Sequence, residues 1–256
     1  MNPSKSMTTP IDISEEAGVR YLHFGSEWVQ GAMRIRAPYK LELAYTREMM
    51  AGLLMYPEPW PRKVLIIGLG AASLVKFFHR NYPETEIRVV EIEPQVVAAA
   101  AYFFKLPEED ERLSIILGDG ADFIEDTDEC FDYVFVDGFD QHADTGRLAG
   151  ADFYKCLRDK LSDQAVVAAN MFNESGDYLN NLERLMWAFD ERVLAFPSAD
   201  EGNAIAFAAI GEPVAMSLTE MRKRADALKQ RNGLNLLPTI SRLEQAGHVP
   251  GGMLRL

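Results

Sequence analysis

The chain has 256 residues, of which 48% are hydrophobic and 25% charged, with 18 glycines and 13 prolines. These proportions are typical of soluble globular proteins and exclude a disordered, collagen-like or coiled-coil molecule. The formal net charge of −13 at pH 7 repels phosphate backbones, so we expect no nucleic-acid partner.

The two cysteines, Cys130 and Cys156, have no metal-ligand spacing, so we expect neither a disulfide framework nor a zinc ribbon. Four scattered histidines give no zinc-binding spacing either, so no metal is expected. The first residues lack the apolar core of a signal peptide, and no stretch reaches the roughly 18 apolar residues of a membrane span. The expected location is therefore cytoplasmic, with no membrane partner.

In chain order, residues 1–17 carry Pro, Ser and Thr and are expected to form a flexible N-terminus. Two short runs at 19–24 and 28–35, rich in aromatic and β-branched residues, flank a glycine-containing turn and predict a β-hairpin. Apolar residues at helical spacing over 41–54 predict a helix that ends at the prolines following it. Residues 18–60 therefore form an expected N-terminal unit of hairpin and helix.

From residue 61 the pattern changes to alternating strands and helices. Short apolar strands are expected at 64–67, 87–90, 113–116, 131–136, 165–169, 192–196 and 204–208. Helices are expected at 73–81, 95–104, from 121, 151–161, 178–189, 218–231 and 240–246. Strands that are apolar on both faces imply a parallel sheet covered by helices, and the last two strands suggest an antiparallel edge.

We therefore predict an α/β fold with a doubly wound, mostly parallel, seven-stranded Rossmann-like sheet and a small N-terminal β-hairpin. The Rossmann-like domain is expected to span residues 61–211, and residues 212–256 are expected to add a C-terminal helical extension.

The first strand of the alternating region leads directly into a glycine turn, Gly68-Leu69-Gly70-Ala71-Ala72-Ser73. Gly68 permits a tight turn, and Gly70 allows a ligand to approach the backbone closely. A dinucleotide fingerprint has a third glycine where this chain has Ser73, although Ser73 alone does not exclude a phosphate. A plain strand-to-helix turn that contains glycine is the alternative interpretation.

Acidic residues follow the next three strands. Glu91 ends the second strand about 20 residues after the glycines, where a carboxylate accepts hydrogen bonds from both ribose hydroxyls. Asp119, in Gly118-Asp119-Gly120, is placed to meet an adenine amino group, and Asp137 follows the fourth strand. Ligands of open parallel sheets bind beyond the carboxyl ends of the strands. Acids gathered there suit a cationic sulfonium nucleoside better than an anionic pyrophosphate, so we expect an S-adenosyl ligand.

At these residues the chain resembles the spermidine/spermine synthase family of polyamine aminopropyltransferases, which has the class I methyltransferase fold. The resemblance spans about residues 18–210. Its motifs are the strand before Gly68, then Val90-Glu91-Ile92-Glu93, Gly118-Asp119-Gly120, the strand that ends at Asp137, and Phe153-Tyr154.

The resemblance implies a donor pocket for decarboxylated S-adenosylmethionine. It assigns the ribose to Glu91 and the adenine to Asp119. The donor-binding residues expected in full are Gln30, Gly68, Gly70, Glu91, Ile92, Asp119 and Gly120. By the same resemblance, Asp137 accepts a proton from the attacking amine or orients it, and Asp140 holds the same amine.

Three features depart from the family pattern. The family's Gly-Gly-Gly-Asp-Gly-Gly turn has an Asp, which binds the donor's ammonium group, where this chain has Ala71. The family's Asp-Ser-Ser-Asp-Pro loop is here Asp137-Gly138-Phe139-Asp140-Gln141, in which Phe139 narrows or re-aims the pocket. The segment that begins with Tyr45 is one residue longer than the family's, so Tyr45 is not expected to reach the substrate and receives no polyamine-binding role.

Three hypotheses for the function remain open at this point. The favoured one is a spermidine synthase-like aminopropyltransferase acting on putrescine or a related small amine. The second is an S-adenosylmethionine-dependent methyltransferase, because Ala71 no longer repels the carboxylate of that donor. The third is a non-catalytic nucleoside-binding homologue. Decarboxylated S-adenosylmethionine or S-adenosylmethionine is the expected co-substrate, no cofactor is expected to bind tightly, and a homodimer is expected.

Overall fold

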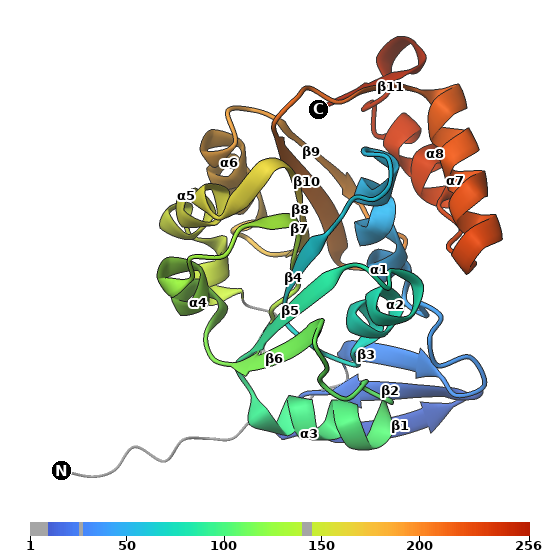
Figure 1. The fold of residues 1–256 in the computed structure, drawn as a ribbon, viewed down its shortest axis with the longest axis vertical. Coiled ribbons are helices and arrows are strands. Elements are labelled where there is room, and N and C mark those ends of the chain that lie inside the picture. Colours follow the sequence, from blue (N-terminus) through green and yellow to red (C-terminus); the bar gives the residue numbers. More distant parts are fainter. Residues whose placement is uncertain (1–9, 26–27, 140–144) are drawn as a thin grey trace.

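The computed structural model describes residues 10–25, 28–139 and 145–256, and its centre is a seven-stranded sheet (Figure 1). The strand order is β6-β5-β4-β7-β8-β10-β9. The strands are β4 (Lys63–Ile67), β5 (Glu86–Glu91), β6 (Leu113–Leu117), β7 (Phe131–Val136), β8 (Leu161–Phe172), β9 (Val193–Pro197) and β10 (Asn203–Ile210). Strands β4 to β8 pair in parallel, and β10 runs antiparallel to both β8 and β9. The predicted doubly wound, mostly parallel sheet is confirmed.

Helices cover both faces of this sheet (Figure 1). One face carries α4 (Gly120–Asp126), α5 (Ala151–Asp159) and α6 (Tyr178–Ala188), and the other carries α1 (Ala44–Met49), α2 (Ser73–Asn81) and α3 (Pro94–Phe103). The alternation along one strand shows the reason. Val64 and Ile66 of β4 pack into one buried apolar cluster, whereas Leu65 and Ile67 pack into the other. A strand with apolar side chains on both faces is stable only between two helical layers.

The N-terminal unit is a separate sheet of three antiparallel strands, β1 (Asp12–Glu16), β2 (Val19–His23) and β3 (Val29–Arg34). The sequence predicted two of these strands and a flexible end up to residue 17, so the prediction was wrong for Asp12–Glu16. Almost every side chain of β1 is exposed, so β1 lacks the apolar alternation by which strands are predicted. Its backbone pairing with β2 forms it instead.

The predicted helix over 41–54 is divided into α1 and a 3-10 helix, η1 (Met50–Leu54). The C-terminal extension contains α7 (Leu218–Asn232) and α8 (Leu237–Gln245), close to the predicted helices. It also contains two strands that the sequence did not predict, β11 (Ala215–Ser217) and β12 (Met253–Arg255), which pair antiparallel. Three residues are too few to show a strand period.

Two further 3-10 helices, η2 (Gly146–Ala149) and η3 (Pro250–Gly252), complete the described elements. Buried residues of the N-terminal sheet and of the C-terminal extension, such as Leu22 and Leu254, belong to the same cluster as the central strands. The domain boundaries proposed from the sequence stay predictions. In the part of the chain that the structure describes, none of the helices has the length and apolar character to cross a membrane.

One lysine lies inside the core between α2 and α3. Lys76 is 1% exposed, and its Nζ donates a hydrogen bond to the carbonyl oxygen of Phe104 at 2.8 Å. Arg20 donates to the neighbouring carbonyl of Phe103 at 2.6 Å, so two cationic groups bind the carboxyl end of α3. Burial lowers the pKa of Lys76 from 10.5 to about 7, because the core disfavours its charged form.

We predict that Lys76→Met changes how stability depends on pH. Folded Lys76 loses its proton near pH 7, whereas the unfolded chain keeps it up to about 10.5. The unfolded state therefore binds more protons between these values. The free energy of unfolding consequently rises with pH there, by at most about 1.4 kcal/mol per pH unit from this group.

The stability of Lys76→Met relative to the wild type is therefore expected to be greatest below about pH 7 and to shrink towards pH 10. Urea unfolding across this range measures the difference. Lys155→Met, at an exposed lysine, is the control and should keep the wild-type pH dependence. Equal pH dependence of Lys76→Met and the wild type would contradict the lowered pKa of Lys76.

Candidate active site

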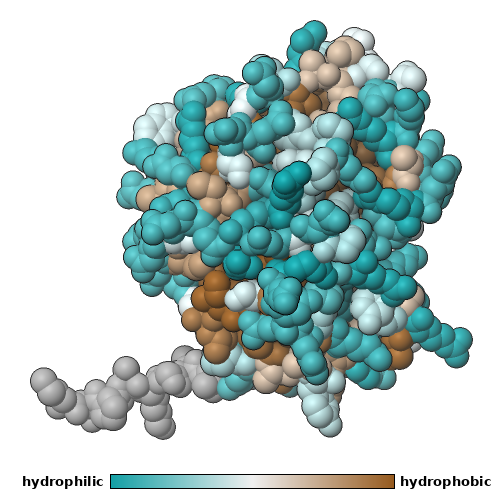
Figure 2. Space-filling view, viewed as in Figure 1, coloured by the Kyte–Doolittle hydropathy of each residue, from teal (hydrophilic) through white to brown (hydrophobic). Residues whose placement is uncertain are grey.

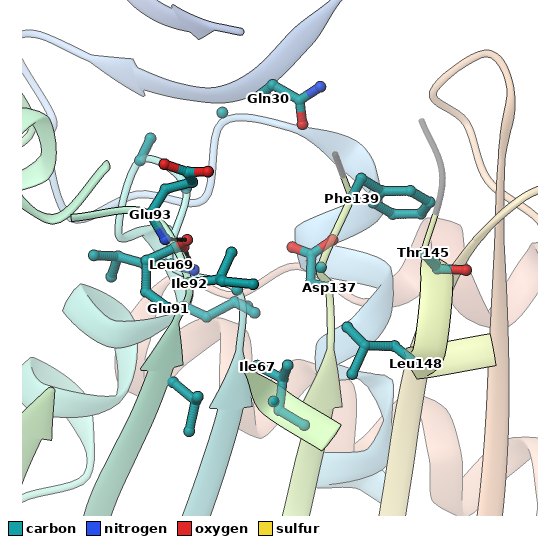
Figure 3. Close-up of a pocket in the computed structure, with 18 of the residues that line it drawn as sticks. Gln30, Ile67, Leu69, Glu91, Ile92, Glu93, Asp137, Phe139, Thr145 and Leu148 are labelled. Carbon is teal, nitrogen blue, oxygen red and sulfur yellow. Dashed lines mark hydrogen bonds between the residues drawn. The ribbon is translucent and has the colours of Figure 1, made fainter. Parts of the chain in front are cut away.

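A pocket of about 300 Å³ opens at the carboxyl ends of β4, β5 and β7. The strand order reverses between β4 and β7, which is where open parallel sheets bind their ligands. Figure 3 shows Glu91 and Glu93 on one side of the pocket and Asp137 and Phe139 on the other, with Gln30 facing them from the N-terminal sheet. Three segments that are distant in sequence therefore form one site.

The glycine turn after β4 determines how closely β3 and the end of β7 approach each other at the pocket. Gly68 has a φ of +97°, and a Cβ at this position would lie 2.2 Å from the carbonyl oxygen of Asp137. Gly31 of β3 packs closely on the other side of the turn, since a Cβ there would lie 2.7 Å from the backbone nitrogen of Ala71. The absence of side chains at Gly68 and Gly31 brings Asp137 and Gln30 to the same pocket.

Glu91 fixes the turn from the end of β5. Its two carboxylate oxygens accept the backbone N–H groups of Leu69 and Glu93, each at 2.9 Å. The side chain is buried, and burial raises the pKa of Glu91 although these N–H groups favour the charged form. Glu91 thus both holds the glycine turn and lines the pocket.

Asp119 is the N-cap residue of α4 and pairs with Arg147, a cation that the sequence motifs did not predict at this site. Its Oδ1 accepts the backbone N–H of Ala121 at 2.7 Å, which caps the helix. Its Oδ2 lies 3.5 Å from Nη1 of Arg147, which also pairs with Asp122 and Glu125. The rim is therefore less negative than predicted, because Arg147 offsets part of the acidic charge beside Asp119.

Apolar side chains are exposed at the same end of the pocket. Ile92 lines it and is 61% exposed, and Leu117, the residue of β6 that pairs with Glu91, is 58% exposed. Figure 2 shows a largely hydrophilic surface with hydrophobic residues gathered low on this face, over the region of β5 and β6. Such exposed apolar surface beside a polar pocket is suited to cover a flat aromatic base.

Asp137, like Glu91, has a hydrogen-bond donor on each of its carboxylate oxygens, and here both donors are side chains. Tyr45 Oη donates to Oδ2 at 3.2 Å, and Asn170 Nδ2 donates to Oδ1 at 2.9 Å. Asn203 Nδ2 donates to Oδ1 of Asn170 at 2.9 Å and so orients the Asn170 amide. Burial raises the pKa of Asp137 to about 7, so both protonation states are populated near neutral pH.

The structure brings most of the predicted site residues together. Eight of them line this pocket, namely Gln30, Gly68, Gly70, Glu91, Ile92, Asp119, Gly120 and Asp137. Asp140 lies outside the described residues. The binding roles of these residues stay predictions. In residues 10–25, 28–139 and 145–256, no three His, Cys, Asp or Glu side chains are grouped to hold a metal ion.

Tyr45 was not expected to reach the substrate, yet the structure places it in the wall of this pocket. Tyr45 lines the pocket, because it lies in the first turn of α1 and Asp200 accepts its backbone N–H at 2.8 Å. Asn170 was missed because it lies near the carboxyl end of β8, in an apolar run that carries no motif. The one feature that could have indicated it is its position, because an amide side chain near the carboxyl end of a parallel strand is placed to contact a ligand.

The sheet order and the glycine turn define a class I methyltransferase-like fold, and solved structures agree. A probable spermidine synthase from Corynebacterium glutamicum matches with a TM-score of 0.67 at 18% identity, covering 78% of this chain and 76% of that one. Human methyltransferase-like protein 13 in complex with SAH matches with a TM-score of 0.61 at 22% identity, covering 79% and 91%. At these identities the similarity shows the fold.

The sequence comparisons show the family. Residues 42–191 match the spermine/spermidine synthase domain. The polyamine aminopropyltransferase of Chromobacterium violaceum is 35% identical over 254 residues, which cover 99% of this chain and 97% of the relative. That of Neisseria meningitidis serogroup B is 35% identical over 235 residues, covering 92% and 89%. The chain belongs to the spermine/spermidine synthase family and is a transferase.

We predict that Gly68→Ala destabilises the protein by at least about 2 kcal/mol, because the new Cβ meets the Asp137 carbonyl and the backbone has a positive φ. Urea unfolding measures the loss. Gly118→Ala is the matched control at a neighbouring strand end, where a Cβ meets no atom within 4 Å. It should leave stability unchanged or raise it by up to about 1 kcal/mol. Equal stabilities of the two variants would refute the packing argument.

Proposed function

We propose that this protein transfers an aminopropyl group from decarboxylated S-adenosylmethionine to a small amine such as putrescine. The observation that carries the proposal is the Asp137 carboxylate, held from both sides by Tyr45 and Asn170 beside the glycine turn. Relatives named polyamine aminopropyltransferase, 35% identical over nearly the full chain, support the same activity.

In this proposal the donor nucleoside occupies the part of the pocket between Gln30 and β5. Glu91 accepts the ribose hydroxyls with lone pairs that its two backbone donors leave available. Gly70 allows the donor to lie against the backbone, and Ile92 covers the adenine. Asp119 accepts the adenine amino group through Oδ2, while its Oδ1 caps α4.

The chemistry is a displacement at carbon. A neutral amine nitrogen forms a bond to the aminopropyl carbon, and the carbon–sulfur bond breaks with its electron pair remaining on sulfur. Methylthioadenosine leaves, and the proton lost by the new ammonium passes to the Asp137 carboxylate and then to solvent. Tyr45 and Asn170 hold that carboxylate in one orientation, so the amine nitrogen is aligned with carbon and sulfur.

Methyl transfer from S-adenosylmethionine is the second candidate, and Ala71 is the observation that favours it. Ala71 lines the pocket and offers no carboxylate to an aminopropyl ammonium group. The extended similarity to aminopropyltransferases outweighs this single position, so we place aminopropyl transfer first.

Incubating the purified protein with putrescine and each of the two donors tests the proposal. We expect mass spectrometry to find an aminopropyl group on putrescine with the decarboxylated donor, and methylated putrescine with neither donor. Asp137→Asn should lower kcat roughly 10²–10⁴-fold and keep a thermal shift with the donor. Asp152→Asn, at an exposed aspartate, is the control and should keep full activity. Methylated amine, or full activity of Asp137→Asn, would count against the proposal.

The pH dependence of the reaction follows from the same carboxylate. Because the charged form of Asp137 is the base and its pKa is about 7, kcat/KM for the amine should fall as the pH drops through about 7. Tyr45→Phe removes a hydrogen bond that favours the charged form, so the falling limb should move to higher pH. Profiles between about pH 5 and 9 measure this.

Tyr102→Phe, at a tyrosine that is 82% exposed, is the control for the pH profile and should reproduce the wild-type limb. A limb that stays in place in Tyr45→Phe would show that this hydroxyl does not act on the catalytic base.

The homodimer and the cytoplasmic location expected from the sequence remain part of this proposal, and light scattering of the purified protein tests the dimer.

A further inference from the structure

Another buried carboxylate, outside the pocket lining, lies between α1, the turn from β9 to β10, and α8. Glu48 of α1 is 3% exposed. Its Oε1 lies 3.0 Å from Nε of Arg242 and accepts the backbone N–H of Ala199 at 3.1 Å, and Ser198 Oγ donates to Oε2. Arg242 belongs to α8 of the C-terminal extension and is the one cation paired with Glu48 among the described residues.

The same turn is connected to the candidate catalytic acid. Ser198 Oγ accepts the backbone N–H of Asp200 at 3.0 Å, and Asp200 Oδ2 accepts the backbone N–H of Tyr45 at 2.8 Å. The Tyr45 hydroxyl then donates to Asp137. A continuous series of contacts therefore runs from Arg242 on α8 to the Asp137 carboxylate.

These contacts compensate for the weakness of α1 as a helix. It has six residues, and its N-cap residue, Leu43, provides no side-chain hydrogen bond. Helices this short depend on tertiary contacts, and Asp200 supplies the missing cap from a distant turn. Glu48 binds that turn from the α1 side. The orientation of Tyr45 is thus determined by two reciprocal contacts between α1 and the turn.

Arg242 is needed because the two acids involved repel each other. Burial raises the pKa of Glu48, and the charge on Asp200 adds to this, whereas the two hydrogen-bond donors of the turn and the Arg242 guanidinium favour the charged form. Without Arg242 the buried Glu48 carboxylate would keep its hydrogen bonds but have no cation to balance its charge beside Asp200, which is unfavourable. The turn would then separate from α1, and Tyr45 would lose its cap.

We propose that Arg242 is a positioning residue, which holds Tyr45, and through it Asp137, by neutralising Glu48 beneath the turn from β9 to β10. The C-terminal extension is on this view part of the catalytic machinery, without touching substrate. The inference rests on the proposed role of Asp137 in aminopropyl transfer.

The test compares Arg242→Met with Arg222→Met, a matched control. Arg222 is on α7 of the same extension, is exposed, and pairs with Glu244 at 3.5 Å, outside these contacts. Arg242→Met should lower kcat for the amine about tenfold, because small displacements of catalytic groups are costly, and leave the KM for the donor unchanged. It should also move the acid limb of kcat/KM to higher pH, as Tyr45→Phe does. Arg222→Met should match the wild type in kcat for the amine, in KM for the donor and in the position of the acid limb.

Two further variants separate positioning from folding. Arg242→Lys keeps the charge and should recover most of the activity. The double variant Glu48→Gln with Arg242→Met buries no unpaired charge, so it should fold with near wild-type stability and return the acid limb to near its wild-type position. A limb that stays displaced in this folded double variant would overturn the inference.

A double-mutant cycle tests whether the effect passes through Tyr45. Adding Arg242→Met to Tyr45→Phe should produce no further shift of the acid limb, because the hydroxyl that Arg242 positions is already absent. Additive shifts would overturn the proposed route. The ring carbon that bears the Tyr45 hydroxyl, followed by NMR, should change its chemical shift in Arg242→Met and not in Arg222→Met. This signal is independent of turnover, so it tests the inference even if the wild type transfers no aminopropyl group.

Discussion

The backbone of the glycine turn passes so close to the end of β7 that no side chain fits between them. A Cβ on Gly68 would lie 2.2 Å from the Asp137 carbonyl, while the backbone N–H of Asp137 donates to the Ile67 carbonyl at 2.8 Å. This contact lies where the strand order reverses, so it brings the glycine turn and the Asp137 carboxylate together at one edge of the sheet. The distance between the glycine turn and Asp137 is therefore set by backbone packing.

The electrostatic character of the site depends more on the burial and the partners of its acidic side chains than on how many such side chains there are. Arg147 offsets Asp119, and Arg242 offsets Glu48. Asp137 has neutral partners only among the described residues, so removal from water raises its pKa to about 7. A carboxylate in this state is ready to exchange a proton with an amine near neutral pH.

Both ends of the chain contribute to a site whose motifs lie in the central domain. Gly31 of the N-terminal sheet packs on the glycine turn and carries Gln30 over the pocket. The C-terminal extension contacts α1, which carries Tyr45, through the ion pair of Arg242 with Glu48. The small size of α1 explains this arrangement, because a six-residue helix that presents Tyr45 needs support from neighbouring elements.

The amino-acid sequence by itself determined the layered fold and the position of the pocket. Apolar runs, a glycine turn and acids after successive strands are local patterns, and the sheet topology brings strand ends together in a known way. Only the tertiary structure decided the strand at Asp12–Glu16, the arrival of Tyr45 at the pocket, and the partners Asn170 and Arg147. Each of these depends on pairing between residues distant in the chain, and such pairing leaves no periodic pattern in the residues that form it.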